Sequence, residues 1–202
     1  RHKLKRFVQI GSSDEYGNAL APQHEDLREQ PISPYSFAKV ASTHFLQMLH
    51  RTENFPAVSL RLFLTYGPGQ GISRFLPQII RGCLDDATFP TSAGEQLRDF
   101  CYVDDMIEAL IRLMGKPKDF SGPINLGNPK EFTILELAKL VIEATKSNSI
   151  IHFKDLPVDD PLQRQPDISL AKAKLDWEPT IKLRDGLQDT IRYFSNLWNF
   201  RK

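Results

Sequence analysis

The sequence predicts an α/β fold with a largely parallel sheet. Short apolar stretches alternate with longer amphipathic stretches along the whole chain, and this alternation is typical of strands connected by helices. The composition agrees, because 41% of the 202 residues are hydrophobic and 25% are charged, as in an ordinary globular protein with a real core. Neither an internal repeat nor a low-complexity segment argues for another class of fold.

Local signals support the individual elements. Ser33 and Pro34 are a capping residue and a proline at the first helical position, so they predict the start of a long helix. Thr133 followed by Glu136 is a capping box and predicts another helix start. Strands are expected at residues 7–10, 57–64, 88–91, 123–126 and 150–153, and helices at residues 35–53, 74–83, 104–114, 133–145, 169–175 and 183–198.

Composition also limits the function. A net charge of +1 argues against a general surface for nucleic acids or anionic membranes. No apolar run approaches the roughly 20 residues that span a bilayer. Cys83 and Cys101 form no metal-spaced cluster and the five histidines are scattered, so we expect no metal site and a reducing, cytoplasmic compartment.

The most informative residues are Tyr35 and Lys39. They are four positions apart on the longest predicted helix, so their side chains share one face and can touch. A lysine ammonium beside a phenol favours the phenolate and lowers the pKa of the tyrosine. Such a pair is suited to move a proton when an alcohol is oxidised or a ketone is reduced.

A Tyr-x-x-x-Lys pattern also arises by chance, so the surrounding sequence decides how strongly it indicates an active site. The predicted strand at residues 7–10 ends in Gly11-Ser12-Ser13, before a loop and the helix that carries Tyr35. Serines at a strand end, followed by a helix with Tyr and Lys, are laid out as in the active site of short-chain dehydrogenases and reductases. Ser12 would then hold the substrate hydroxyl.

That chemistry needs a nicotinamide cofactor, and a glycine-rich phosphate loop for one is not evident. Gly67, Gly69 and Gly71 follow a strand, but the third glycine of G-x-G-x-x-G would fall on Ile72. Pro68 has no N–H to offer a phosphate. Together with a start that lacks Met, this predicts that the chain is the C-terminal part of a larger protein or has a different fold.

Five motifs in order carry a family resemblance over nearly the whole chain. The chain resembles the C-terminal two-thirds of an extended short-chain dehydrogenase/reductase, of the NAD-dependent nucleotide-sugar epimerase/dehydratase type. The motifs are Ser12-Ser13-Asp14-Glu15-Tyr16-Gly17; Tyr35-x-x-x-Lys39; Arg61-Leu62-Phe63-x-x-Tyr66-Gly67-Pro68-Gly69; Gly94-Glu95-Gln96-x-Arg98-Asp99-Phe100-x-Tyr102-Val103-Asp104-Asp105; and Asp160-Pro161-x-x-Arg164-x-Pro166-Asp167 with Leu175-x-Trp177-x-Pro179.

The resemblance implies a fold. It implies the C-terminal part of a doubly wound, Rossmann-type parallel sheet plus a smaller α/β substrate-binding domain. Residues 1–66 would belong to the first, and residues 67–202 mainly to the second, with residues 104–128 returning to the main sheet.

The resemblance also implies roles for named residues. Tyr35 would be the catalytic base and acid, and Ser12 would bind the reacting hydroxyl, with Ser13 and Asp14 beside it. NAD or NADP would contact Tyr35, Lys39, Phe63 and Ile10, and the nucleotide sugar would contact Arg98, Arg164, Leu64 and Arg74. Arg98 and Arg164 would clamp the diphosphate, since two guanidinium groups from distant loops can hold it. Without the resemblance, Arg98 would be an ion-pair partner of Asp99 or Asp104, and Arg164 a solvated loop charge.

Two departures from the family pattern matter. Leu64 stands where the family usually has an asparagine that touches the nucleotide sugar. Dehydratases of the family carry Thr-Asp-Glu at the strand end, whereas an ungapped alignment gives Ser12-Ser13-Asp14 here. A one-residue deletion would instead align Ser13-Asp14-Glu15 with the dehydratase triplet, and the sequence leaves both registers open.

The function expected is therefore NAD(P)-dependent modification of a nucleotide-linked hexose through a keto-sugar, of the epimerase or 4-ketoreductase type. The alternatives are a 4,6-dehydratase and a non-catalytic binding protein on a degenerate enzyme fold. The resemblance implies a homodimer formed through the helix at residues 35–53. Its apolar stripe fits either a dimer face or a core and consists of Phe37, Val40, Ala41, Phe45, Met48 and Leu49.

Overall fold

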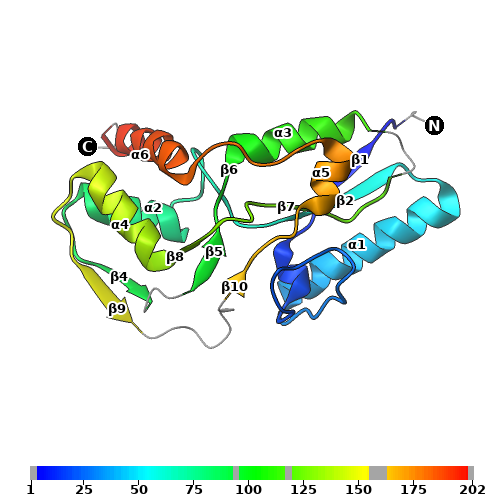
Figure 1. Ribbon diagram of the computed structural model, residues 1–202, viewed down its shortest axis with the longest axis horizontal. Coiled ribbons are helices and arrows are strands. Elements are labelled where there is room, and N and C mark those ends of the chain that lie inside the picture. Colours follow the sequence, from blue (N-terminus) through cyan, green and yellow to red (C-terminus); the bar gives the residue numbers. More distant parts are fainter. Residues whose placement is uncertain (1–3, 93–95, 117–119, 155–162, 200–202) are drawn as a thin grey trace.

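The computed structural model describes residues 4–92, 96–116, 120–154 and 163–199 (Figure 1). The parts of the sequence motifs at Gly94, Glu95, Asp160 and Pro161 lie outside the described residues.

The α/β class is confirmed by a parallel sheet. Its strands are β1 (Phe7–Ile10), β2 (Ala57–Leu62) and β7 (Ile124–Leu126), in the order β1-β2-β7, and both pairings are parallel. The carboxyl ends of β1 and β2 therefore meet at one edge, where Gly11-Ser12 follows β1 and Phe63 follows β2. In parallel sheets this edge is where ligands bind.

Helix α1 (Pro34–Glu53) connects β1 to β2 and packs against β2. It begins as the sequence predicts, because the Ser33 hydroxyl accepts the Ser36 backbone N–H and Pro34 occupies the first turn. The 20 residues of this helix hold Tyr35 at its amino-terminal end, beside the strand ends.

The two faces of β2 differ in character because side chains alternate along a strand. Val58 and Leu60 lie in an apolar cluster with residues of α3 (Val103–Met114) and α5 (Ser169–Leu175), closed by Trp177. Arg61 points to the opposite face, and it is fully buried there.

A second apolar cluster holds the other end of the molecule together. It joins α2 (Phe75–Leu84), α4 (Ile134–Thr145) and α6 (Leu183–Asn199), which lie side by side near the C-terminus in Figure 1. The parallel pair β4 (Phe89–Ser92) and β9 (Ile151–Lys154) continues from these helices. The predicted capping box of α4 is confirmed, since Thr133 and Glu136 satisfy each other's backbone amides.

Short elements connect the two clusters, and the sequence did not predict them. Strands β10 (Gln163–Arg164), β5 (Leu97–Asp99) and β8 (Glu131–Thr133) form one small sheet, and β3 (Thr65–Tyr66) pairs with β6 (Cys101–Tyr102). The strand expected at residues 57–64 ends at Leu62. The next strand, β3, pairs with β6 outside the main sheet. Runs of two or three residues carry no periodicity, which is why they escaped prediction.

The apolar stripe of α1 faces outward from this chain. Phe37 is 64% exposed and Phe45 57% exposed, whereas the buried residues of the helix are Ser36 and Thr43. The stripe is therefore not part of the chain's own core, and the molecule presents an apolar surface on this helix.

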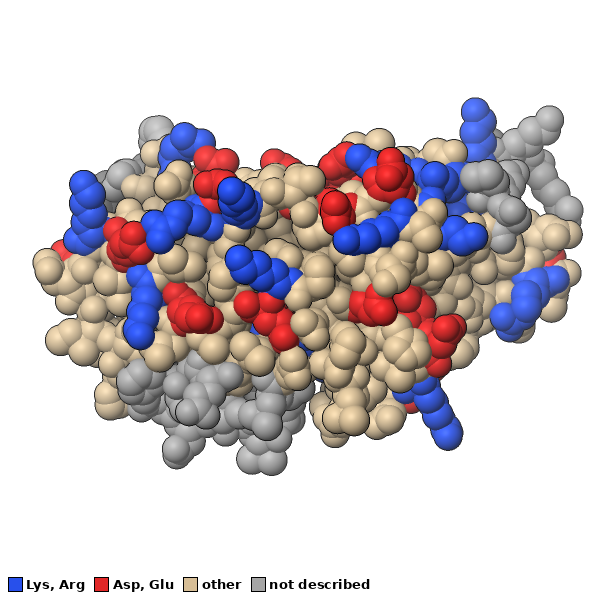
Figure 2. Space-filling view, viewed as in Figure 1, with Lys and Arg blue, Asp and Glu red and all other residues tan. Residues whose placement is uncertain are grey.

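Within the described ranges, no helix is long and apolar enough to cross a membrane. Nor do those residues contain a group of three His, Cys, Asp or Glu side chains placed to hold a metal ion. Figure 2 shows basic and acidic side chains interspersed on the face that it presents. The domain boundary at residue 66 remains a prediction, although β7 places part of the later sequence in the main sheet.

Candidate functional site

A cavity of about 820 Å³ lies between the strand ends of the main sheet and the small sheet of β5 and β10. Its volume is within the size range of small-molecule sites. Ten of the predicted site residues line it: Ile10, Ser12, Ser13, Asp14, Tyr35, Phe63, Leu64, Arg74, Arg98 and Arg164. One cavity thus collects residues that are more than 150 positions apart.

The predicted Tyr35–Lys39 pair forms on the first turns of α1. The Lys39 ammonium lies 5.5 Å from the centre of the Tyr35 ring. Its Nζ donates a hydrogen bond to the Ile10 carbonyl at 2.8 Å, at the end of β1. Lys39 is not part of the cavity lining, but this contact holds its ammonium group next to the Tyr35 ring. Half of the Tyr35 surface is open to the cavity side and solvent.

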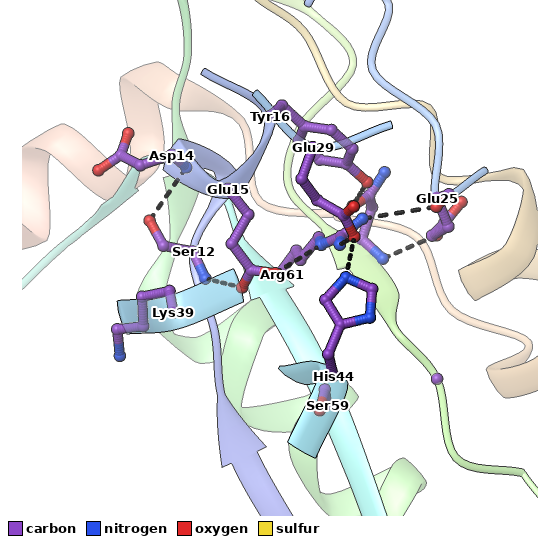
Figure 3. A network of polar contacts seen from close by, with 12 residues as sticks. Ser12, Asp14, Glu15, Tyr16, Glu25, Glu29, Lys39, His44, Ser59 and Arg61 are labelled. Carbon is purple, nitrogen blue, oxygen red and sulfur yellow. Dashed lines mark hydrogen bonds and ion pairs between the residues drawn. The ribbon is translucent and has the colours of Figure 1, made fainter. Parts of the chain in front are cut away.

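Ser12 and Asp14 are presented by a tight turn, η1 (Ser13–Tyr16). Ser12 caps this turn, and its Oγ accepts the Asp14 backbone N–H at 3.1 Å. The Asp14 side chain is half exposed toward the cavity, and its carboxylate lies 3.6 Å from the Arg164 guanidinium. The turn therefore places a hydroxyl and a carboxylate together at the cavity wall (Figure 3).

Arg98 and Arg164 are neighbours on adjacent strands. They are paired in register where β5 and β10 run parallel, so their side chains leave the same face of the small sheet. Each residue is only 7% exposed. Arg164 donates to the Gly17 carbonyl at 2.8 Å, and Arg98 to the Leu97 carbonyl at 2.9 Å. The reading of Arg164 as a solvated loop charge is therefore wrong, because the residue is buried in the wall of the cavity.

Glu15 does not line the cavity. Its side chain is fully buried on the other side of the turn, and Oε2 accepts a hydrogen bond from Arg61 Nε at 3.0 Å. The gapped register, in which Ser13, Asp14 and Glu15 would match a dehydratase triplet, therefore places its second acid away from the reacting space. Asp14 is the acid of this turn that lines the cavity.

Sequence reasoning missed Asp99, which also contributes to the cavity wall. Oδ1 accepts the Leu64 N–H at 3.4 Å, while Oδ2 has no hydrogen-bond partner among the described residues. Burial raises the pKa of Asp99 to about 8, so the neutral acid predominates at pH 7. In the sequence it was indistinguishable from an ion-pair partner of Arg98.

The comparisons with known proteins agree with this geometry. The family model described as "NAD dependent epimerase/dehydratase family" matches residues 1–127, which is more than half of the chain. The chain belongs to this family. The family resemblance inferred from the motifs is thereby confirmed.

Individual relatives of the family are similar to this chain in sequence. The chain is 41% identical over 194 residues to UDP-glucuronic acid decarboxylase 6 of Arabidopsis thaliana, covering 90% of this chain and 55% of the relative. It is 28% identical to the uncharacterized UDP-glucose epimerase YtcB of Bacillus subtilis, covering 98% of this chain and 63% of that protein. The chain thus spans about half to two-thirds of the length of these relatives.

Solved structures resemble the whole described fold. UDP-glucuronic acid 4-epimerase from Bacillus cereus, in complex with UDP-glucuronic acid and NAD, superposes with a TM-score of 0.88 at 31% identity, over 96% of this chain and 63% of that one. UDP-glucose 4-epimerase from Thermotoga maritima gives a TM-score of 0.90 at 28% identity, over 97% of this chain and 65% of that one. The arrangement of the elements around the cavity is therefore that of the family.

Proposed function

We propose that this chain forms the substrate-binding and proton-transferring part of an NAD-dependent enzyme that oxidises a hydroxyl of a UDP-linked hexose or hexuronic acid. The keto-sugar so formed is then reduced again, epimerised or decarboxylated. The observation that carries the proposal is the single cavity shared by Ser12, Asp14, Tyr35 and the paired Arg98 and Arg164. The names of the relatives support the substrate class.

The residues of the chain fit the nicotinamide end of NAD. Lys39 is held by the Ile10 carbonyl with its ammonium beside Tyr35, and an ammonium group has three donors, so it can also donate to a ribose hydroxyl. Phe63 is an apolar wall of the same cavity. When bound, NAD accepts a hydride from the sugar carbon and returns it later. We therefore propose NAD rather than NADP, on the basis of the family and of its solved complexes.

Proton transfer is assigned to Tyr35. As the reacting C–O–H becomes C=O, the hydroxyl proton passes to the Tyr35 oxygen and the carbon loses a hydride. Ser12 donates to or accepts from the same hydroxyl and fixes its direction. In the reverse step Tyr35 returns the proton to the oxygen of the reduced ketone.

The diphosphate is assigned to Arg98 and Arg164. Their side chains leave the same face of the small sheet and both residues line the cavity, and guanidinium groups bind phosphate oxygens through paired, charge-assisted hydrogen bonds. Arg74, at the start of α2, adds a third positive side chain to the same cavity. Leu64 lines the wall at the position where the family usually has an asparagine, so the contact with the substrate there would be apolar.

A 4,6-dehydratase is the second candidate, and it is less favoured. The resemblance gives its acid–base pair as two carboxyl groups of the turn, Asp14 and Glu15, whereas Glu15 forms an ion pair with Arg61 behind the turn. A non-catalytic binding protein is the third, and the assembled Tyr35, Lys39 and Ser12 set argues against it.

We further propose that the enzyme is a homodimer that uses the outer face of α1. The stripe of Phe37, Phe45 and Met48 is exposed in this chain, and burying it between two copies would remove a sizeable apolar surface from water. We keep the division at residue 66 between a cofactor-binding part and a substrate-binding part as part of this proposal.

Product analysis tests the proposed function. The full-length protein is incubated with NAD and either UDP-glucuronic acid or UDP-glucose, and the sugar and released CO₂ are measured. Epimer or pentose formation supports the proposal, and a 4-keto-6-deoxy sugar would identify the dehydratase. A nucleotide-linked 4-keto-6-deoxyhexose with reduced nicotinamide tests the ketoreductase directly. No change in any of these substrates contradicts the proposal.

A further inference from the structure

A buried charge network lies directly behind the turn that carries Ser12. Arg61 and Glu15 are both fully buried, and Arg61 also pairs with Glu29, which in turn contacts His44 of α1. The Arg61 guanidinium stacks on the Tyr16 ring, 4.6 Å from its centre. Figure 3 shows the contacts that connect His44 through Glu29 and Arg61 to Glu15 and Ser12.

Glu15 is the member of this network that contacts Ser12. One carboxylate oxygen accepts from Arg61, and the other, Oε1, accepts the backbone N–H of Ser12 at 3.1 Å. A Cβ at Gly11 would lie 2.4 Å from the Leu60 carbonyl oxygen and 2.5 Å from Oε1, so the backbone of β2 and the Glu15 carboxylate together leave no room for a side chain there. Each oxygen of the Glu15 carboxylate therefore has its own partner. Oε2 pairs with the Arg61 guanidinium, and Oε1 accepts the backbone N–H that fixes the position of Ser12.

A fully buried carboxylate is costly unless a cation accompanies it. Arg61 supplies that charge and is itself shared with Glu29. Burial on its own lowers the pKa of Arg61, but the neighbouring acids outweigh it and raise the pKa, so the guanidinium stays charged. Such a network can hold the backbone of Ser12 more rigidly than an apolar contact, because hydrogen bonds are directional.

We propose that Glu15 and Arg61 are positioning residues, which fix the main chain at Ser12 and thereby aim its hydroxyl at the reacting C–O–H of the sugar. The inference rests on the proposed function. Glu15 acts through Ser12 and does not touch the substrate. Its contribution is therefore expected in kcat and not in the KM for the nucleotide sugar.

Glutamine at position 15 provides a sharp test, because an amide has one acceptor oxygen where the carboxylate has two. In Glu15→Gln, Arg61 attracts that oxygen, so the NH₂ group faces the Ser12 N–H as donor against donor. We expect kcat to fall by about 10- to 100-fold at unchanged KM, as for a small misplacement of a reacting group. The control is Glu143→Gln on α4, which breaks an exposed ion pair with Arg184 on α6 and should leave kcat unchanged.

Two double variants separate positioning from folding. Both remove the Glu15–Arg61 ion pair: one is Glu15→Gln/Arg61→Met and the other is Glu15→Leu/Arg61→Met. Only the Gln variant keeps an acceptor for the Ser12 N–H. With Arg61 gone, the amide oxygen can turn to Ser12, so the Gln double variant should have a kcat at least about tenfold above the Leu double variant, at similar KM and unfolding midpoint.

Equal kcat values in the two double variants would overturn the inference. If neither double variant folds, Glu15→Gln alone decides, and a wild-type kcat there would overturn it. Absence of sugar oxidation in the wild-type protein is a different result, because it would overturn the proposed function and the inference together.

Discussion

Arg98 and Arg164 stand opposite each other in register on the parallel strands β5 and β10, and both are buried in the wall of one cavity. Their separation of 66 positions in the sequence hides this relationship. Arg164 also lies 3.6 Å from the Asp14 carboxylate. The two arginines place positive charge on one wall of the cavity, and this arrangement supports the proposed diphosphate site.

Arg98→Gln is expected to weaken binding of the nucleotide sugar. A charge-assisted hydrogen bond to a diphosphate contributes about 1.5–3 kcal/mol, so KM should rise by about 10- to 100-fold while kcat changes little. Steady-state kinetics check this, with Arg184→Gln on the surface of α6 as the control. An unchanged KM in Arg98→Gln would exclude Arg98 from the diphosphate site.

Tyr35→Phe is expected to abolish proton transfer without abolishing binding. Loss of a general acid–base group lowers kcat by about 10²- to 10⁴-fold. Calorimetric titration with the UDP-sugar should give a dissociation constant close to that of the wild type, because the residues proposed for the diphosphate, Arg98 and Arg164, are on other elements of the cavity wall. Turnover at the wild-type rate in Tyr35→Phe would remove Tyr35 from the mechanism.

Asp99→Asn is expected to change how stability depends on pH. Burial raises the pKa of Asp99 to about 8 in the folded protein, and an unfolded Asp titrates near 3.9. Between these values the unfolded state releases a proton that the folded state keeps, so the contribution of Asp99 to stability falls as pH rises from about 4 to about 8.

The neutral amide lacks this dependence. Measured by denaturant unfolding, Asp99→Asn should gain stability relative to the wild type by a few kcal/mol between pH 4.5 and pH 7.5, since each pKa unit is about 1.4 kcal/mol. A wild-type-to-variant difference that is the same at both pH values would show that Asp99 is ionised in the folded protein.

Phe45→Glu is expected to disrupt the proposed dimer. Phe45 is 57% exposed in the centre of the α1 stripe, and a charge there would be buried without a partner at the interface. Sedimentation velocity on the full-length protein should show a dimer for the wild type and a monomer for the variant. Glu53→Gln, at the end of the same helix, is the control. A monomeric wild type would contradict the dimer.

Much of the fold and the site could be predicted from the sequence, for reasons that particular residues make plain. Ser33-Pro34 and Thr133 with Glu136 are local capping signals, so α1 and α4 begin where expected. Most residues that the ordered motifs suggest for the site line one cavity, and their roles stay predictions.

The remainder depends on long-range contacts. The two residues of β10 acquire their strand structure only by pairing with β5, and nothing in their own sequence predicts it. Glu15 could be read as a catalytic acid until Arg61, 46 positions later, was placed against it. The apolar stripe of α1 has the same pattern whether it is buried or exposed, and only the packing of the chain decided between them.

The most direct test of the account is the nicotinamide absorbance of the full-length protein, mixed rapidly with NAD and UDP-glucuronic acid or UDP-glucose. The account predicts that reduced nicotinamide appears transiently with the wild type as the hydroxyl is oxidised, and that Tyr35→Phe binds the same sugar without producing the signal. A wild-type protein that binds the UDP-sugar and NAD but shows neither reduced nicotinamide nor any change in the sugar would contradict it.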